Sequence, residues 1–178
     1  MAERPTPPEF EKPAVLYHAS PNRNIDRFEP RQESVRDPEE GPVIFASPDE
    51  AYVSMFIIRA GDDWTRRGRF GADEPWHMII SDEKRFRAED KGGAIYHLSS
   101  ASFHSDPERN MPGIEWASKE PVEPTGKEEY DSALSAMLGH GVEVYFVTPE
   151  VFTAIQTSDD HGSELLSHQA PVGAMIKP

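Results

Sequence analysis

The segment Leu16-Tyr17-His18-Ala19-Ser20 begins with bulky side chains and ends with small and polar ones, and the expected architecture builds outward from it. With Ala14 and Val15 before it, the segment starts as a short apolar run, which is typical of a buried strand leading into His18. The residues that follow, Ser20-Pro21-Asn22-Arg23-Asn24, are turn-forming types. We therefore expect a buried strand over 14–17, closed by His18 and followed by a turn.

A second apolar run lies at Pro42-Val43-Ile44-Phe45-Ala46 and predicts a second strand. The tetrapeptide that follows it, Ser47-Pro48-Asp49-Glu50, is typical of a helix start. It offers a serine N-cap, a proline at the first helical position and a glutamate at the capping-box spacing. Apolar residues then recur at helical spacing, so we expect a helix through Ile57 that ends at Gly61.

The remaining elements follow from the same patterns. Further strands are expected at 76–80, around Phe86, at 94–98, 114–118 and 142–147, with an edge strand at 172–176. Helices are expected over 127–138, stopped by Gly139 and Gly141, and from Thr148 through Ile155. The segments 99–113 and 157–167 are polar and are expected to be loops. The basic segment 64–70 is expected to be a solvated loop that could contact a diphosphate or an acidic partner.

Length and composition indicate one folded unit. The chain has 178 residues, of which 37% are hydrophobic, and a domain typically holds about 150 residues. Residues 1–13 are rich in proline and charge, so we expect them to form a flexible Pro-rich arm. We expect residues 14–178 to form a single domain.

The charge balance is strongly acidic. The chain contains 18 Lys and Arg against 32 Asp and Glu, a formal net charge of −14 with a pI near 4.8. Binding to nucleic-acid phosphates depends on Lys and Arg that displace counterions, so neither direct nucleic-acid backbone binding nor membrane association is expected. Two interpretations stay open: an ordinary acidic protein, or a mimic of nucleic-acid charge that inhibits a basic protein partner.

Several classes of site are excluded or disfavoured by the residues. The chain has no cysteine, which excludes disulfides, thiolate zinc sites and cysteine nucleophiles. It has no P-loop, GxGxxG, GxSxG or HExxH pattern, and its histidines are scattered, so no metal is expected. No apolar run approaches the roughly 18 residues of a membrane span, and residues 1–13 lack the apolar core of a secretory signal. We therefore expect a soluble, cytoplasmic protein.

Three motifs occur in an order that resembles the ADP-ribosyltransferase superfamily, in its branch with a histidine on the first strand. The first is Tyr17-His18-Ala19-Ser20, the second is Ile44-Phe45-Ala46-Ser47 leading into a helix, and the third is the acidic segment Ile114-Glu115-Trp116. The resemblance covers residues 14–60 well and 94–124 loosely. It implies an α+β fold, an ADP-ribosyltransferase-like split β-sandwich with short flanking helices.

The resemblance also implies a function and a site. The implied substrate is NAD, whose nicotinamide–ribose bond is cleaved so that ADP-ribose passes to an acceptor or to water. By position, His18 would bind a ribose hydroxyl, Tyr52 would stack on the nicotinamide, and Glu115 would stabilise the positive charge that develops on the ribose. The implied catalytic residues are His18 and Glu115. The implied cofactor-binding residues are His18, Ala19, Ser20, Phe45 and Tyr52.

Two departures from the family pattern keep alternatives open. Many members have tyrosine where this chain has Ile44, which allows a catalytically inactive protein that binds a nucleotide or a partner on the same scaffold. The acidic residue could also be Glu120 or Glu123. Each site residue has a structural interpretation as well: a hydrogen-bonded His18, a core Tyr52 and a solvated surface Glu115.

Overall fold

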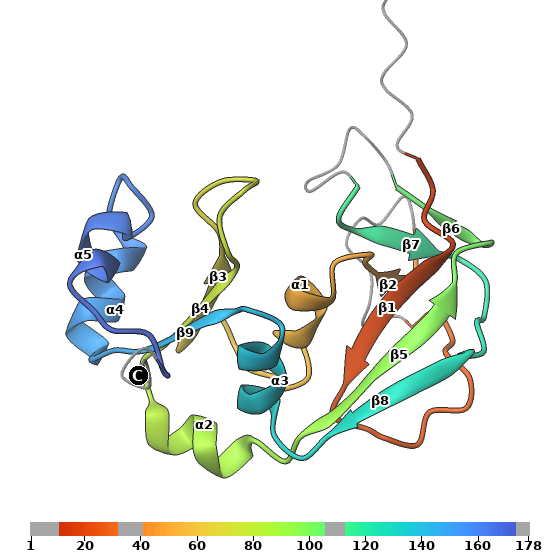
Figure 1. Cartoon of the computed structure of the whole chain (residues 1–178), viewed down its shortest axis with the longest axis horizontal. Helices are drawn as coiled ribbons and strands as arrows, with labels where there is room; N and C mark the ends of the chain where they lie inside the picture. Colours follow the sequence, from red (N-terminus) through yellow and green to blue (C-terminus); the bar gives the residue numbers. More distant parts are fainter. Residues whose placement is uncertain (1–10, 32–40, 106–112, 174–178) are drawn as a thin grey trace, which may run out of the picture.

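A computed structural model describes residues 11–31, 41–105 and 113–173. Within these ranges the chain forms short helices and three small three-stranded sheets, in the orders β1-β5-β8, β2-β7-β6 and β3-β4-β9 (Figure 1). The expected α+β class is therefore confirmed. None of the described helices is long and apolar enough to cross a membrane.

The first sheet contains the strand expected from the opening segment. β1 (Val15–Ser20) pairs antiparallel with β5 (Gly93–Ser99), and β5 pairs antiparallel with β8 (Gly126–Tyr130). At one point β1 also joins the second sheet, because the backbone N–H groups and carbonyls of Tyr17 and Ser47 exchange hydrogen bonds of 2.8 and 2.9 Å. The middle of β1 is thereby held beside the end of β2.

The second sheet consists of β2 (Ile44–Ala46), β7 (Trp116–Ser118) and β6 (Phe103–His104), all antiparallel. A hydrophobic cluster joins it to the first sheet. This cluster includes Leu16, Tyr96 and Leu98 from the first sheet and Ile44, Phe103 and Trp116 from the second, together with Phe28 from the loop after β1. The two sheets thus share one core, and the loop after β1 is packed against it.

The third sheet lies at the other end of the molecule, beyond α1 (Glu50–Ser54) and α3 (Ala133–Gly139) (Figure 1). It contains β3 (Thr65–Gly68), β4 (His77–Ile80) and β9 (Glu143–Phe146), and its β4–β9 pair is parallel. Around it lie α2 (Glu83–Glu89), α4 (Pro149–Gln156) and α5 (Ser163–Ser167). A central core of buried residues, among them Val53, Ile57, Ile95, Met137 and Val144, connects this sheet to the first one.

Most of the expected strands are present, with ends that differ by up to three residues. The last helix begins as predicted, with Thr148 as its N-cap and Pro149 in its first turn. The first helix differs from the prediction. Its N-cap is Asp49 and not Ser47, because the Ser47 hydroxyl accepts the backbone N–H of Asp49 at 3.1 Å. The helix also ends earlier than expected, at Ser54.

Five predictions of local structure were wrong. The strand expected around Phe86 is helix α2, in which Phe86 is the buried residue, and the start of the helix expected over 127–138 is strand β8. The basic segment 64–70 contains strand β3, and the polar segments 99–113 and 157–167 contain β6 and α5. Three of the expected segments lie partly outside the described residues: most of the Pro-rich arm (1–10), residues 106–112 of the expected 99–113 loop, and the end of the expected edge strand (174–176).

Candidate functional site

A cavity of about 550 Å³ opens where β1, β2 and α1 meet. Its lining includes residues from the end of β1, from β2 and from the loop at 21–31, together with Glu115 just before β7. All residues that the resemblance assigned to the site line this one cavity: His18, Ala19, Ser20, Phe45, Tyr52 and Glu115. Of the three glutamates left open by the sequence, Glu115 lines it, whereas Glu120 and Glu123 do not.

His18 presents a neutral imidazole at this cavity. Its Nδ1 lies 2.6 Å from the carbonyl oxygen of Phe45. A carbonyl can only accept, so Nδ1 carries the proton and Nε2 carries a lone pair. Burial is the main cause that lowers the pKa of His18, and the nearby charge of Arg59 lowers it further. The side chain can therefore accept a hydrogen bond from a ligand hydroxyl through Nε2.

Tyr52 and Glu115 form a hydrogen-bonded pair in the lining of the same cavity. The hydroxyl of Tyr52 donates to Oε1 of Glu115 at 2.8 Å. Burial is the main cause that raises the pKa of Tyr52, and the Glu115 carboxylate raises it further. The phenol therefore stays protonated and remains a donor. The pair joins α1 to the residue just before β7, and it fixes the direction of a carboxylate at the cavity.

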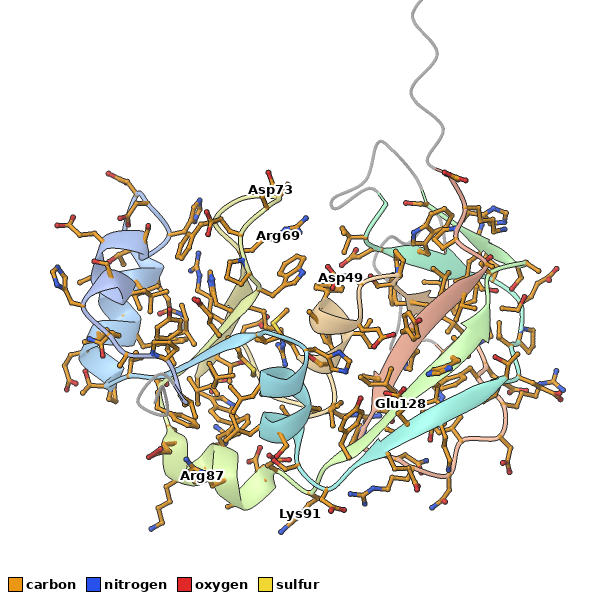
Figure 2. All side chains as sticks on the ribbon, in the orientation of Figure 1. Asp49, Arg69, Asp73, Arg87, Lys91 and Glu128 are labelled. Atoms are coloured by element: carbon orange, nitrogen blue, oxygen red, sulfur yellow. The ribbon has the colours of Figure 1, made fainter. Side chains whose placement is uncertain are left out.

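Asp49 holds α1, and with it Tyr52, in place. Its Oδ1 accepts the backbone N–H of Tyr52 at 3.1 Å, which caps the helix, and its Oδ2 accepts Nε1–H of Trp76 at 2.7 Å. The ring of Trp76 lies 4.9 Å from that of Tyr52. Figure 2 shows Asp49 at the start of α1, facing the side of the molecule that carries Arg69. The sequence did not identify Asp49 as the cap, because Ser47 offers a similar capping side chain two residues earlier.

Three arginines line the cavity and were not expected there. Arg27 and Arg31 come from the loop after β1, and Arg59 follows α1. Among the described residues, two carboxylates also line the cavity: Glu115, and Glu29, whose Oε1 lies 3.4 Å from Nε of Arg27. Within this part of the chain the arginines of the lining outnumber its carboxylates, whereas the chain as a whole has a net charge of −14. No sequence signal identifies this group, because the arginines are spread from position 27 to position 59 of the chain and converge only in the fold.

The basic segment 64–70 lies elsewhere. Arg66 and Arg67 line a separate cavity of about 450 Å³ together with Asp62 and Gln156, and Phe56 borders both cavities. The guanidinium of Arg67 lies 4.7 Å from the centre of the Phe56 ring, and that of Arg69 lies 4.4 Å from the ring of Trp76. These arginines pack on aromatic faces, so the segment is an ordered part of the third sheet and not a solvated loop.

Comparisons of the chain with protein-family models, with curated proteins and with solved structures find no match in any of the three.

Proposed function

We propose that this protein binds NAD, or a derivative of ADP-ribose, in the 550 Å³ cavity and acts as an ADP-ribosyltransferase or NAD glycohydrolase on an ADP-ribosyltransferase-like split β-sandwich. One observation carries the proposal. Six residues, chosen from three separate sequence motifs and the helix that follows the second, line a single cavity, with Tyr52 hydrogen-bonded to Glu115. The volume of the cavity lies within the roughly 300–1,000 Å³ typical of small-molecule sites.

The charge of the cavity suits a dinucleotide. NAD carries a diphosphate, and guanidinium groups bind phosphate oxygens through paired, charge-assisted hydrogen bonds. Arg27, Arg31 and Arg59 supply such groups at this cavity. The neutral His18 adds an acceptor for a ribose hydroxyl, and Ser20 adds a small polar group beside it.

In the proposed reaction the bond between the ribose carbon and the nicotinamide nitrogen breaks. The bonding electron pair leaves with nicotinamide, which becomes neutral, and positive charge develops on the ribose. The Glu115 carboxylate, held by Tyr52, stabilises that charge. Water or an acceptor group then forms the new bond to the ribose carbon and releases a proton.

The test follows nicotinamide release from NAD. Glu115→Gln keeps the size of the side chain and its hydrogen bond to Tyr52 but removes the charge, and we expect its rate to fall by about 100-fold or more. His18→Ala should also slow the reaction. Glu120→Gln, a matched change outside the cavity, should leave the rate unchanged. Equal rates in all four proteins would overturn the catalytic proposal.

A second function is favoured by Ile44. This residue lines the cavity, is only 4% exposed and belongs to the core between the first two sheets. An aliphatic side chain offers no phenol at the position where many ADP-ribosyltransferases have tyrosine. A catalytically inactive protein that binds NAD or ADP-ribose would show saturable binding in calorimetry, weakened by His18→Ala, without release of nicotinamide.

A further inference from the structure

Three side chains converge on a point outside the cavity described above. Glu50 is the first residue of α1, Glu128 lies on β8, and His140 follows α3. One oxygen from each carboxylate and one nitrogen of the imidazole all lie within 4.8 Å of one another. Figure 2 shows Glu128 where β8 approaches α3. None of the three residues lines the cavity.

The hydrogen bonds around His140 determine which nitrogen is available. The hydroxyl of Tyr130 donates its only proton to Oε2 of Glu128 at 2.8 Å. The hydroxyl oxygen of Tyr130 also lies 3.0 Å from Nε2 of His140, so it accepts a hydrogen bond from the Nε2–H group. In the neutral imidazole the lone pair is then on Nδ1, which faces the Glu50 carboxylate.

The distance between Nδ1 of His140 and Oε2 of Glu50 is 3.4 Å. A charge-assisted hydrogen bond between an imidazolium and a carboxylate is shorter, about 2.7–2.9 Å. Two ligand atoms on one tetrahedral zinc ion, each about 2.0–2.1 Å from the metal, lie roughly 3.3 Å apart. The observed separation fits two ligands of a common ion better than a direct ion pair.

The surroundings of these groups also match those of a metal site. Metal-binding histidines typically donate their second N–H to a neighbouring oxygen, which fixes the ring. Tyr130 provides that oxygen for His140 and at the same time holds Glu128. One tyrosine hydroxyl, that of Tyr130, therefore orients two of the three converging groups.

We propose that Glu50, Glu128 and His140 bind one Zn²⁺ ion, with water as the fourth ligand. Two carboxylates and a neutral imidazole offset the charge of a divalent ion, and the nitrogen ligand favours zinc over Mg²⁺ or Ca²⁺, which prefer oxygen. The ion would tie the start of α1 to β8 and to the end of α3. The sequence contains no ligand spacing for such a site, because its members lie at positions 50, 128 and 140.

The experiment uses the full chain without a histidine tag, treated with EDTA and dialysed, in calorimetric titrations with ZnCl₂, MgCl₂ and CaCl₂. We expect one Zn²⁺ per chain and much weaker binding of the other two ions. His140→Gln keeps an amide N–H for Tyr130 but removes the imidazole, and it should weaken Zn²⁺ binding by more than about 100-fold. Tyr130→Phe should weaken it by about 10–100-fold, as is typical of an orienting partner.

Matched controls separate this site from weak surface binding. Glu129→Gln changes the neighbouring residue of β8, and His168→Gln changes a histidine at the end of α5, so both should leave the affinity unchanged. Thermal unfolding without zinc checks that the variants fold. Absence of saturable one-to-one Zn²⁺ binding by the wild-type chain, or equal affinity in wild type and in a folded His140→Gln variant, would overturn the proposal. The activity tests above do not depend on this result.

Discussion

His18 keeps a neutral imidazole because its surroundings disfavour the charged form. Burial is the main cause, and Arg59 adds to it, whereas the hydrogen bond to the Phe45 carbonyl acts in the opposite direction. Burial likewise lowers the pKa of His77 on β4, which is 4% exposed and has the Phe70 ring against it at 4.6 Å. Both histidines therefore bind protons less readily in the folded chain than in the unfolded one.

This difference predicts a loss of stability in mildly acidic solution. Below about pH 6.5 the unfolded chain binds protons at these histidines, whereas the folded chain resists them until its lower pKa values are reached. The free energy of unfolding should therefore fall as the pH drops from 7.5 to 5.5, by at most about 1.4 kcal/mol per pH unit for each histidine. Urea unfolding at a series of pH values measures this slope.

Two variants test whether His77 causes this dependence of the unfolding free energy on pH. His77→Gln should flatten the dependence of stability on pH, because a neutral amide takes up no proton. The exposed His168→Gln should keep the wild-type slope. A His77→Gln variant that is destabilised but retains the full slope would contradict the assignment, since its loss would then come from packing alone.

At the scale of residues, the sequence identified the side chains that a short motif contains but not those that support them. His18, Ala19 and Ser20 are consecutive, and Glu115 stands beside Trp116. Asp49 and Arg59 could not be assigned, because their roles depend on Trp76 and on the loop after β1, which reach them only through tertiary contacts.

Helix α1 has five residues, too few for a helix to be stable by itself. Its position therefore depends on contacts at its ends, and Asp49 makes two of them, with the Tyr52 backbone and with Trp76 Nε1. Helix α2 has a similar cap, Asp82, whose side chain accepts the backbone N–H of Arg85 at 2.9 Å. Asp49 differs from Asp82 because it also accepts a hydrogen bond from Nε1–H of Trp76.

This difference predicts unequal effects of the same substitution. Asp82→Ala should lower the free energy of unfolding by about 1 kcal/mol, the usual value of an N-cap. Asp49→Ala should cost about 2–4 kcal/mol, because it also leaves the buried indole N–H of Trp76 without its charged acceptor. Urea unfolding followed by tryptophan fluorescence measures both. Equal losses would mean that the Trp76 bond does not contribute to stability.

The elements that were mispredicted are those whose structure depends on a neighbour. β8 has the sequence Gly126-Lys-Glu-Glu-Tyr130, with no apolar alternation, and it is a strand because its backbone pairs with β5. α2 buries only Phe86, and a single apolar residue shows no period. Its two i,i+4 ion pairs, Arg85–Glu89 and Glu83–Arg87, were the signal that could have identified it. The strands with continuous apolar runs, such as β4 and β9, were predictable.

For the molecule as a whole, charge repulsion is the largest effect visible in the composition. The 32 acidic side chains exceed the 18 basic ones, and repulsion among like charges destabilises a compact state. Ion pairs such as Arg87–Glu83, whose side chains are 56% and 51% exposed, offset little of this, because exposed pairs contribute about 0–1 kcal/mol each.

Added salt should therefore stabilise the folded chain at neutral pH. Raising NaCl from 0.05 to 0.5 M shortens the screening length from more than about 10 Å to about 4–5 Å, which weakens repulsion across the surface more than attraction within close pairs. We expect the Tm at pH 7.5 to rise with NaCl in thermal unfolding followed by circular dichroism. Near the pI of 4.8 the net charge vanishes, so the increase should disappear there. A Tm that falls with salt at pH 7.5 would show that favourable ion pairs outweigh the net charge.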